Sequence, residues 1–162
     1  MFSTTQMPIE LVVVGKVFRC KMFKIQDLKF KVVATVKVFE NLEIWKLSRV
    51  LCDDINSIAN NSELIRDYRL YNQIDGSSGS IMDNIAEGFE RNGNKEFIQF
   101  LSIAKASCEE TRSQLYRIFD RKYVTEIEFN KLKKQTIISS KMIGGFKTYL
   151  KNSDFQGSKY KS

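Results

Sequence analysis

Residues 97–118 decide the fold, and they read FIQFLSIAKASCEETRSQLYRI. Apolar or small side chains recur in this stretch at alternating steps of four and three residues, at Phe97, Leu101, Ala104, Cys108, Thr111, Leu115 and Ile118. That spacing turns one face of an α-helix toward a packing partner over three heptads. Asn94, just before the stretch, is the expected N-cap residue because its side chain can accept a hydrogen bond from a free backbone N–H group.

The same spacing recurs in three other stretches. A first helix is predicted for residues 41–60, with a stripe at Ile44, Leu47, Leu51, Ile55 and Ile58. A second is predicted for residues 66–87, with Gly88 as its C-terminal cap and a stripe at Leu70, Ile74, Ile81 and Ile85. The last begins with a capping-box pattern at Thr125 and Glu128 and continues through Phe129, Leu132, Thr136, Ser139, Ile143, Phe146 and Leu150. The predicted fold class is all-α, an antiparallel up-down-up-down four-helix bundle with an N-terminal extension of uncertain structure.

Residues 76–80 (GSSGS) depart from ordinary helix composition. Each glycine in a helix interior costs about 1 kcal/mol relative to alanine. The segment therefore indicates either a local break or a face of small residues against which another helix packs closely. The second interpretation is favoured, because apolar positions keep the helical register across the segment.

Three parts are expected along the chain: an extension over residues 1–38, the bundle over 39–151 and a polar tail over 152–162. The extension holds seven basic and two acidic residues, which account for most of the net charge of +7. Alternation of Leu28, Phe30 and Val32 with lysines indicates a short strand or hairpin there. We interpret the extension as an appendage outside the core. One explanation for it is translation from a start codon upstream of the natural one.

Composition argues against several classes of enzyme. The chain has no histidine, the commonest general base, so a di-iron bundle built on Glu-x-x-His pairs is impossible. Cys20, Cys52 and Cys108 form no CxxC pair, and their odd number is typical of a reducing cytoplasm. Cys108 is expected in the core rather than as a nucleophile. No apolar run is long enough to span a membrane. We therefore predict a cytoplasmic, non-enzymatic protein without cofactor or metal.

Charge is distributed unevenly along the bundle. Residues 39–111 contain thirteen acidic and seven basic side chains, whereas residues 112–162 contain four acidic and twelve basic ones. One interpretation is that the basic part binds the phosphates of RNA or DNA, through Arg112, Arg117, Arg121, Lys122, Lys131, Lys133, Lys134, Lys141 and Lys147. A second is that a basic surface of one subunit meets an acidic surface of the next, and a third is a solvated charged surface with neither role. The phenylalanines mostly occupy core positions, so no aromatic platform for stacking bases is predicted.

Polar residues gather between the second and third helices. Asn84 and Glu87 share a helix face near Arg91, and Lys95 and Glu96 follow in the next first turn. They predict a buried polar contact that fixes this corner or a subunit junction, with capping and solvation as the alternative. Glu96 also suits the positive N-terminal end of a helix.

Three motifs carry a resemblance to a known family: residues 39–46 (FENLEIWK), 84–91 (NIAEGFER) and 95–101 (KEFIQFL). In this order they resemble the four-helix-bundle family first named for proteins encoded in intervening sequences of bacterial 23S ribosomal RNA. The accessory variability determinant of diversity-generating retroelements looks related to it. The resemblance extends over about residues 38–150. It implies motif or interface roles for Asn84, Glu87, Gly88, Arg91, Lys95, Glu96 and Phe97.

The resemblance also implies a homopentamer and, for the retroelement relatives, binding to nucleic acid and to a reverse transcriptase. The chain departs from the family pattern at Met82, where many relatives carry proline, at residues 76–80, and at Cys108, Glu109 and Thr111. The expected function is that of an oligomeric, nucleic-acid-binding accessory protein. The alternative is a protein–protein interaction scaffold with no nucleic-acid role.

Overall fold

The structure is a computed structural model, and it describes residues 10–13, 16–19, 36–91 and 93–152. The chain divides into two compact units, residues 1–31 and 32–162. In the first unit, strand β1 (Glu10–Val13) pairs antiparallel with β2 (Lys16–Arg19), a hairpin that the sequence analysis did not predict. The strand predicted around Leu28, Phe30 and Val32 lies outside the described residues.

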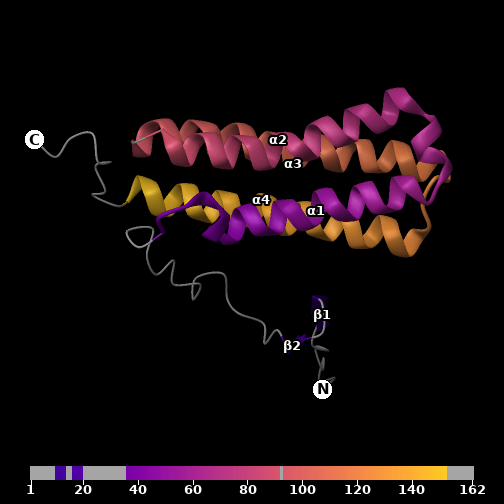
Figure 1. The fold of residues 1–162 in the computed structure, drawn as a ribbon, viewed down its shortest axis with the longest axis horizontal. Coiled ribbons are helices and arrows are strands. Elements are labelled where there is room, and N and C mark those ends of the chain that lie inside the picture. Colours follow the sequence, from indigo (N-terminus) through magenta and orange to yellow (C-terminus); the bar gives the residue numbers. More distant parts are fainter. Residues whose placement is uncertain (1–9, 14–15, 20–35, 92, 153–162) are drawn as a thin grey trace, which may run out of the picture. The chain divides into compact units, whose positions relative to one another are not determined.

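The second unit contains the bundle. Its long helices within the described residues are α1 (Glu43–Asn60), α2 (Tyr68–Glu90), α3 (Asn94–Asp120) and α4 (Glu126–Lys151). Successive helices run antiparallel, and contacts join α1 to α2, α2 to α3, α3 to α4 and α4 back to α1 (Figure 1). The prediction of an up-down-up-down four-helix bundle is therefore confirmed.

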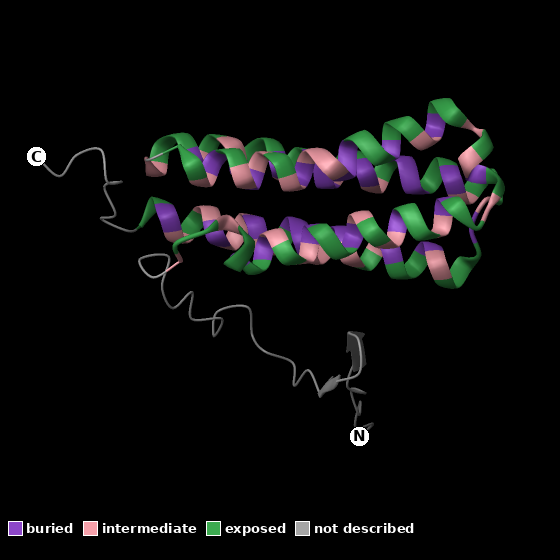
Figure 2. Ribbon diagram, viewed as in Figure 1, coloured by how far each residue is buried: buried purple, intermediate pink, exposed green. Residues whose placement is uncertain are grey.

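The four predicted stripes meet in one core (Figure 2). All seven stripe residues of α3 are buried, as are all seven of α4 and all four of α2. In α1, Leu47 and Ile58 are only half-buried, while Ser48 and Ala59 lie on the inner face. Burying one leucine or isoleucine side chain stabilises a fold by about 1.5–3 kcal/mol, so these stripes supply the main driving force for the bundle.

The first two helices begin later than predicted because short 3-10 helices precede them. One spans Phe39–Asn41, and the other spans Glu63–Arg66. The true N-cap of α2 is Asp67, whose carboxylate accepts a hydrogen bond from the Leu70 N–H group at 3.2 Å. The same carboxylate also pairs with Arg121, which follows the end of α3.

The capping box at the start of α4 is confirmed. Glu128 accepts from the Thr125 N–H group at 2.8 Å, and Thr125 Oγ1 accepts from the Glu128 N–H group at 3.3 Å. The prediction of Asn94 as the N-cap of α3 is wrong, because Gly93 holds that position. The Asn94 side chain instead donates a hydrogen bond to the Leu150 carbonyl at 3.3 Å and so links α3 to the end of α4.

Gly88 is not a C-terminal cap but an interior residue of α2, which continues to Glu90. It is buried where α2 turns toward α3. A Cβ atom at this position would lie 2.7 Å from both Phe100 Cβ and Phe97 Cδ2, which is too close. Glycine is therefore required here for close approach of the two helices rather than for a left-handed backbone.

Residues 76–80 lie within the continuous helix α2, so the less favoured alternative of a local break is wrong. Ser77 is buried and its Oγ donates to Gln114 Oε1 of α3 at 2.6 Å, with Thr111 Oγ1 at 2.9 Å. Ser80 and Ser107 also form a hydrogen bond across this contact, at 3.0 Å. The close packing is thus made by the serines, while Cβ atoms added at both glycines would meet open space.

Candidate functional site

Two arginines on α3 are held by partners on the α2 side. Arg117 Nη1 donates to Gln73 Oε1 at 2.7 Å, and Arg121 forms an ion pair with Asp67. Partial burial acts to raise the pKa of Asp67, but bonds from the Leu70 N–H group and Arg121 lower it below its usual value. Both arginines, predicted to bind phosphate, therefore already have partners, although their side chains are exposed.

Two more of the predicted basic residues are paired elsewhere. Lys131 Nζ lies 2.8 Å from Asp54 Oδ1 on α1. Arg112 pairs with Glu109 on α3, and Ser140 of α4 also donates to Glu109 at 2.8 Å. These pairs lie against different helices, so the nine predicted residues do not form one surface.

Lys122, Lys134 and Lys141 are exposed and form no ion pair within the described part of the chain. Lys122 follows the end of α3 with a backbone φ of 59°. Lys134 and Lys141 lie on α4.

A row of basic residues follows the line where α3 packs against α4. We call it the α3–α4 seam and define it by Lys105, Arg112, Tyr116, Lys133, Lys147 and Lys151. Tyr116 meets Lys133 at one end, the Glu109–Ser140 bond crosses the middle, and Lys105 lies beside Lys147 at the other end. Lys105 escaped prediction because it lies in the acidic half of the sequence, but its spacing of seven residues to Arg112 and eleven to Tyr116 could have placed it on the same helix face.

Three lysines lie near one another at one end of the seam. Lys105, Lys147 and Lys151 form no ion pair among the residues that the structure describes. Desolvation lowers the pKa of Lys147, and the ammonium groups of Lys151 and Lys105 lower it further. Like charges held together in this way favour binding of an anion, because an anion relieves their repulsion.

An aromatic cluster forms the other end of the seam. The Tyr116 ring meets the Phe129 ring edge to face, with 5.1 Å between centroids, and Phe129 stacks on Phe119 at 4.5 Å. Lys133 Nζ lies 5.1 Å from the Tyr116 centroid, so its charge sits over a ring rather than beside a carboxylate. Tyr116 is 44% exposed. The absence of an aromatic platform was predicted from the core positions of the phenylalanines, without regard to the exposed Tyr116 ring.

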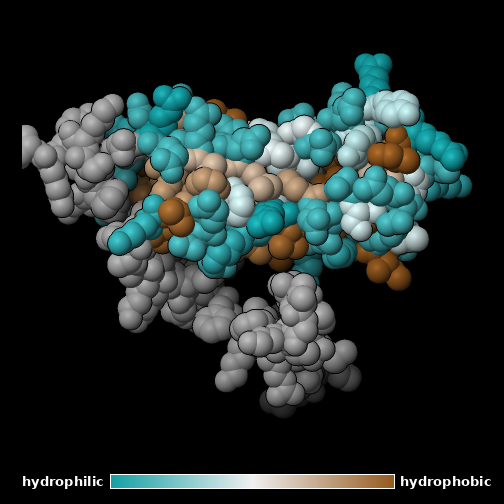
Figure 3. Space-filling model, in the orientation of Figure 1, coloured by the Kyte–Doolittle hydropathy of each residue, from teal (hydrophilic) through white to brown (hydrophobic). Residues whose placement is uncertain are grey.

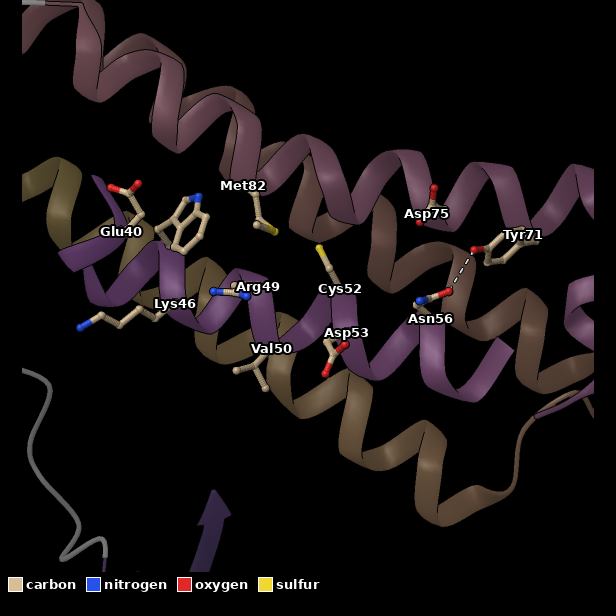
Figure 4. A pocket seen from close by; sticks show the side chains of 11 residues that line it. Glu40, Lys46, Arg49, Val50, Cys52, Asp53, Asn56, Tyr71, Asp75 and Met82 are labelled. Carbon is tan, nitrogen blue, oxygen red and sulfur yellow. Dashed lines mark hydrogen bonds between the residues drawn. The ribbon is translucent and has the colours of Figure 1, made fainter. Parts of the chain in front are cut away.

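A groove of about 890 Å³ lies between α1 and α2, on the face of the bundle away from this seam. Trp45, Val50, Cys52 and Met82 give it apolar walls. Its charged groups are of both signs: Glu40, Asp53 and Asp75 are acidic, and Lys46 and Arg49 are basic. The Met82 and Cys52 side chains point toward each other across it (Figure 4). Apolar groups run along the middle of this otherwise hydrophilic face (Figure 3).

Other kinds of site find little support. Within the described residues, no three histidine, cysteine or acidic side chains gather in a way that could hold a metal ion. Burial raises the pKa of the Cys108 thiol to about 12, so it is a core residue and a poor nucleophile. None of the described helices combines the length and apolar character that crossing a membrane requires.

Comparison with known proteins identifies the family. The sequence pattern of the 23S rRNA-intervening sequence protein family matches residues 40–145. The chain belongs to this family. A crystal structure of a protein of unknown function from the S23 ribosomal protein family, from Bacteroides thetaiotaomicron VPI-5482, has a similar fold, with a TM-score of 0.58 at 20% identity. The match covers 64% of this chain and 97% of that protein. No curated protein matches the chain.

Two of the three motifs that first indicated the 23S rRNA-intervening sequence protein family, residues 84–91 and 95–101, lie on either side of the corner between α2 and α3. Glu87 and Arg91 make an ion pair at 2.6 Å, but it is exposed and lies within α2 rather than buried across the corner. This bond raises the pKa of Arg91. Asn84 donates to the Ser80 carbonyl at 2.7 Å. Lys95 and Glu96, in the first turn of α3, are exposed, whereas Gly88 and Phe97 are buried and pack closely against each other. Close packing therefore fixes this corner.

Proposed function

We propose that this bundle is a non-enzymatic accessory protein that binds the phosphate backbone of nucleic acid along the α3–α4 seam. The observation that carries the proposal is the lysine group of Lys105, Lys147 and Lys151, which repel one another and have no carboxylate partner among the described residues. Lysine and arginine side chains that neutralise phosphates release condensed counterions, and this release drives binding.

Pairing distinguishes the lysines of the seam from some of the other basic residues. Asp67 and Asp54 compensate part of the charge of Arg121 and Lys131. The seam lysines have no ion-pair partner among the described residues. Membership in the 23S rRNA-intervening sequence protein family is compatible with a role beside RNA, and the proposal does not name the larger machine that the protein would assist.

The test is the salt dependence of binding to a short labelled single strand. A triple variant, Lys105→Glu, Lys147→Glu and Lys151→Glu, should reduce the slope of log K against log salt by about two, since each single-strand phosphate contact contributes about 0.7. The matched control, Lys46→Glu, Arg66→Glu and Arg91→Glu, changes net charge equally but alters basic residues that are already paired. Equal losses in both variants, or no binding by the parent protein, would contradict the proposal.

Self-association through the α1–α2 groove is a second candidate function, and the two are compatible. Val50 is 40% exposed and lines the groove together with Trp45 and Met82. We propose that a second copy of the chain covers these apolar groups, with charged groups of that copy facing groove residues of opposite sign, which would give the predicted homo-oligomer.

Light scattering tests this second candidate. The parent protein should have a mass several times that of the 18.8 kDa chain, and Val50→Glu should reduce it. Trp45 is the sole tryptophan and lines the groove, so its emission should shift to longer wavelength as the oligomer dissociates. A monomeric parent protein would refute the self-association proposal and leave the phosphate-binding proposal intact.

A further inference from the structure

The aromatic end of the α3–α4 seam has a geometry that phosphate binding alone does not use. Tyr116 projects from α3 and is 44% exposed, while Phe129 beneath it is only 6% exposed. The edge-to-face contact with Phe129, at 69° between ring planes, holds the tyrosine ring upright on a packed base. Phe119 supports that base by stacking on Phe129 at an angle of 19°.

Lys133 completes this arrangement. Its ammonium group lies 5.1 Å from the Tyr116 centroid and 5.4 Å from the Phe129 centroid. It forms no ion pair within the described residues. A cation over one face of an exposed ring can bind a phosphate while the neighbouring base stacks on the other face. Basic residues and aromatic rings combine in this way where single strands are bound without sequence preference.

We propose that Tyr116 is a stacking platform for an unpaired nucleobase, and that the seam therefore prefers single-stranded nucleic acid over duplex. The inference rests on the proposed phosphate binding and names its ligand class. Bases within a duplex have their faces covered by their neighbours, so only an unpaired base can lie against the tyrosine. Lys105 is eleven residues before Tyr116 on α3, about 16 Å along the helix, so the lysine group would hold phosphates farther along the same strand.

The experiment uses the full chain and three ligands with equal numbers of phosphates: an oligothymidylate, an abasic strand and a hairpin duplex. Tyr116→Ala should weaken binding to the oligothymidylate about five- to thirty-fold, as expected when one base loses its stacking partner. Binding to the abasic strand and to the duplex should change less than about twofold. Tyr116→Phe should retain the parent affinity, because the ring rather than the hydroxyl is needed.

Tyr68→Ala is the matched control, since Tyr68 is 73% exposed on α2, away from the seam. It should not change binding to any ligand. Ultraviolet cross-linking of a 5-bromouracil-substituted strand to the parent protein should map to Tyr116, which keeps the proposal testable even if Tyr116→Ala folds poorly. Equal losses on the abasic strand, or cross-links that avoid Tyr116, would overturn it. If only the lysine variants lose affinity, stacking is refuted and phosphate binding stands; if the parent protein binds none of the ligands, both proposals fall.

Discussion

The two sides of α3 carry similar basic charge but differ in how that charge is compensated. Toward α2, Arg117 and Arg121 bond to Gln73 and Asp67. Toward α4, desolvation lowers the pKa of Lys147, and the neighbouring ammonium groups of Lys151 and Lys105 lower it further. The difference teaches that a count of basic residues does not show how much positive charge a surface presents, because carboxylates within the fold compensate some of these residues and not others.

Breaking the corner that positions α3 should have the largest effect. Gly88→Val would place side-chain atoms into Phe97 and Phe100 Cβ, so we expect a loss of about 1–3 kcal/mol in the free energy of unfolding. Gly76→Ala is the matched control: it meets open space in the same helix, and it should stabilise by about 1 kcal/mol. Urea denaturation of both variants and of the parent protein measures these changes in the free energy of unfolding. A Gly88→Val variant as stable as the parent protein would contradict the close contact at Gly88.

Removing the carboxylate partner of Arg121 should leave uncompensated basic charge on both sides of α3. Asp67→Asn preserves the helix cap, because asparagine caps as well as aspartate, but it removes the ion pair with Arg121. Arg121 then becomes available, and affinity for a single strand should rise a few-fold in a fluorescence anisotropy titration. Unchanged affinity would mean that pairing is not what keeps Arg121 from binding.

The Asp67→Asn variant should also differ from the parent protein in how its stability depends on pH. The pKa of Asp67 is lower in the folded protein than in the unfolded chain, so its stabilisation is present above the unfolded value. The parent protein should lose this contribution as the pH falls below about 4, whereas Asp67→Asn should lack it at every pH. Melting temperatures measured from neutral to acidic pH should therefore converge at low pH.

Relieving the lysine repulsion should have the smallest effect. Lys147→Gln should stabilise the free protein by up to about 0.5 kcal/mol while weakening its binding to a single strand. Folding lowers the pKa of Lys147, so the protonated lysine destabilises the parent protein. The gain in stability of Lys147→Gln over the parent protein is therefore present where the lysine is protonated and disappears above about pH 10. Lys141→Gln, an exposed lysine on the same helix, should leave thermal stability unchanged.

The core was predictable because it depends on one repeated spacing. Leu101, Leu115 and Ile143 all lie at stripe positions and all are fully buried. Helix ends were less predictable, since they depend on single contacts between distant segments. Gly88 looked like a terminal cap, but the aromatic ring that makes it necessary belongs to the next helix.

The site was less predictable than the fold for the same reason. Lys131 and Arg121 lie 77 and 54 residues from the carboxylates that hold them, and no local pattern indicates such pairs. Lys105 belongs to an acidic half of the sequence, yet it lies beside Lys147 in the bundle. Helix packing, and not the linear distribution of charge, determines which basic residues have partners.

Lysine reactivity is the most direct test of which basic residues contact nucleic acid. The full chain would be acetylated with and without a saturating single strand, and modification would be quantified at each lysine by mass spectrometry. We expect protection at Lys105, Lys147 and Lys151 and no change at the ion-paired Lys46 and Lys131. Protection of Lys46 and Lys131 equal to that of the seam lysines would contradict the account.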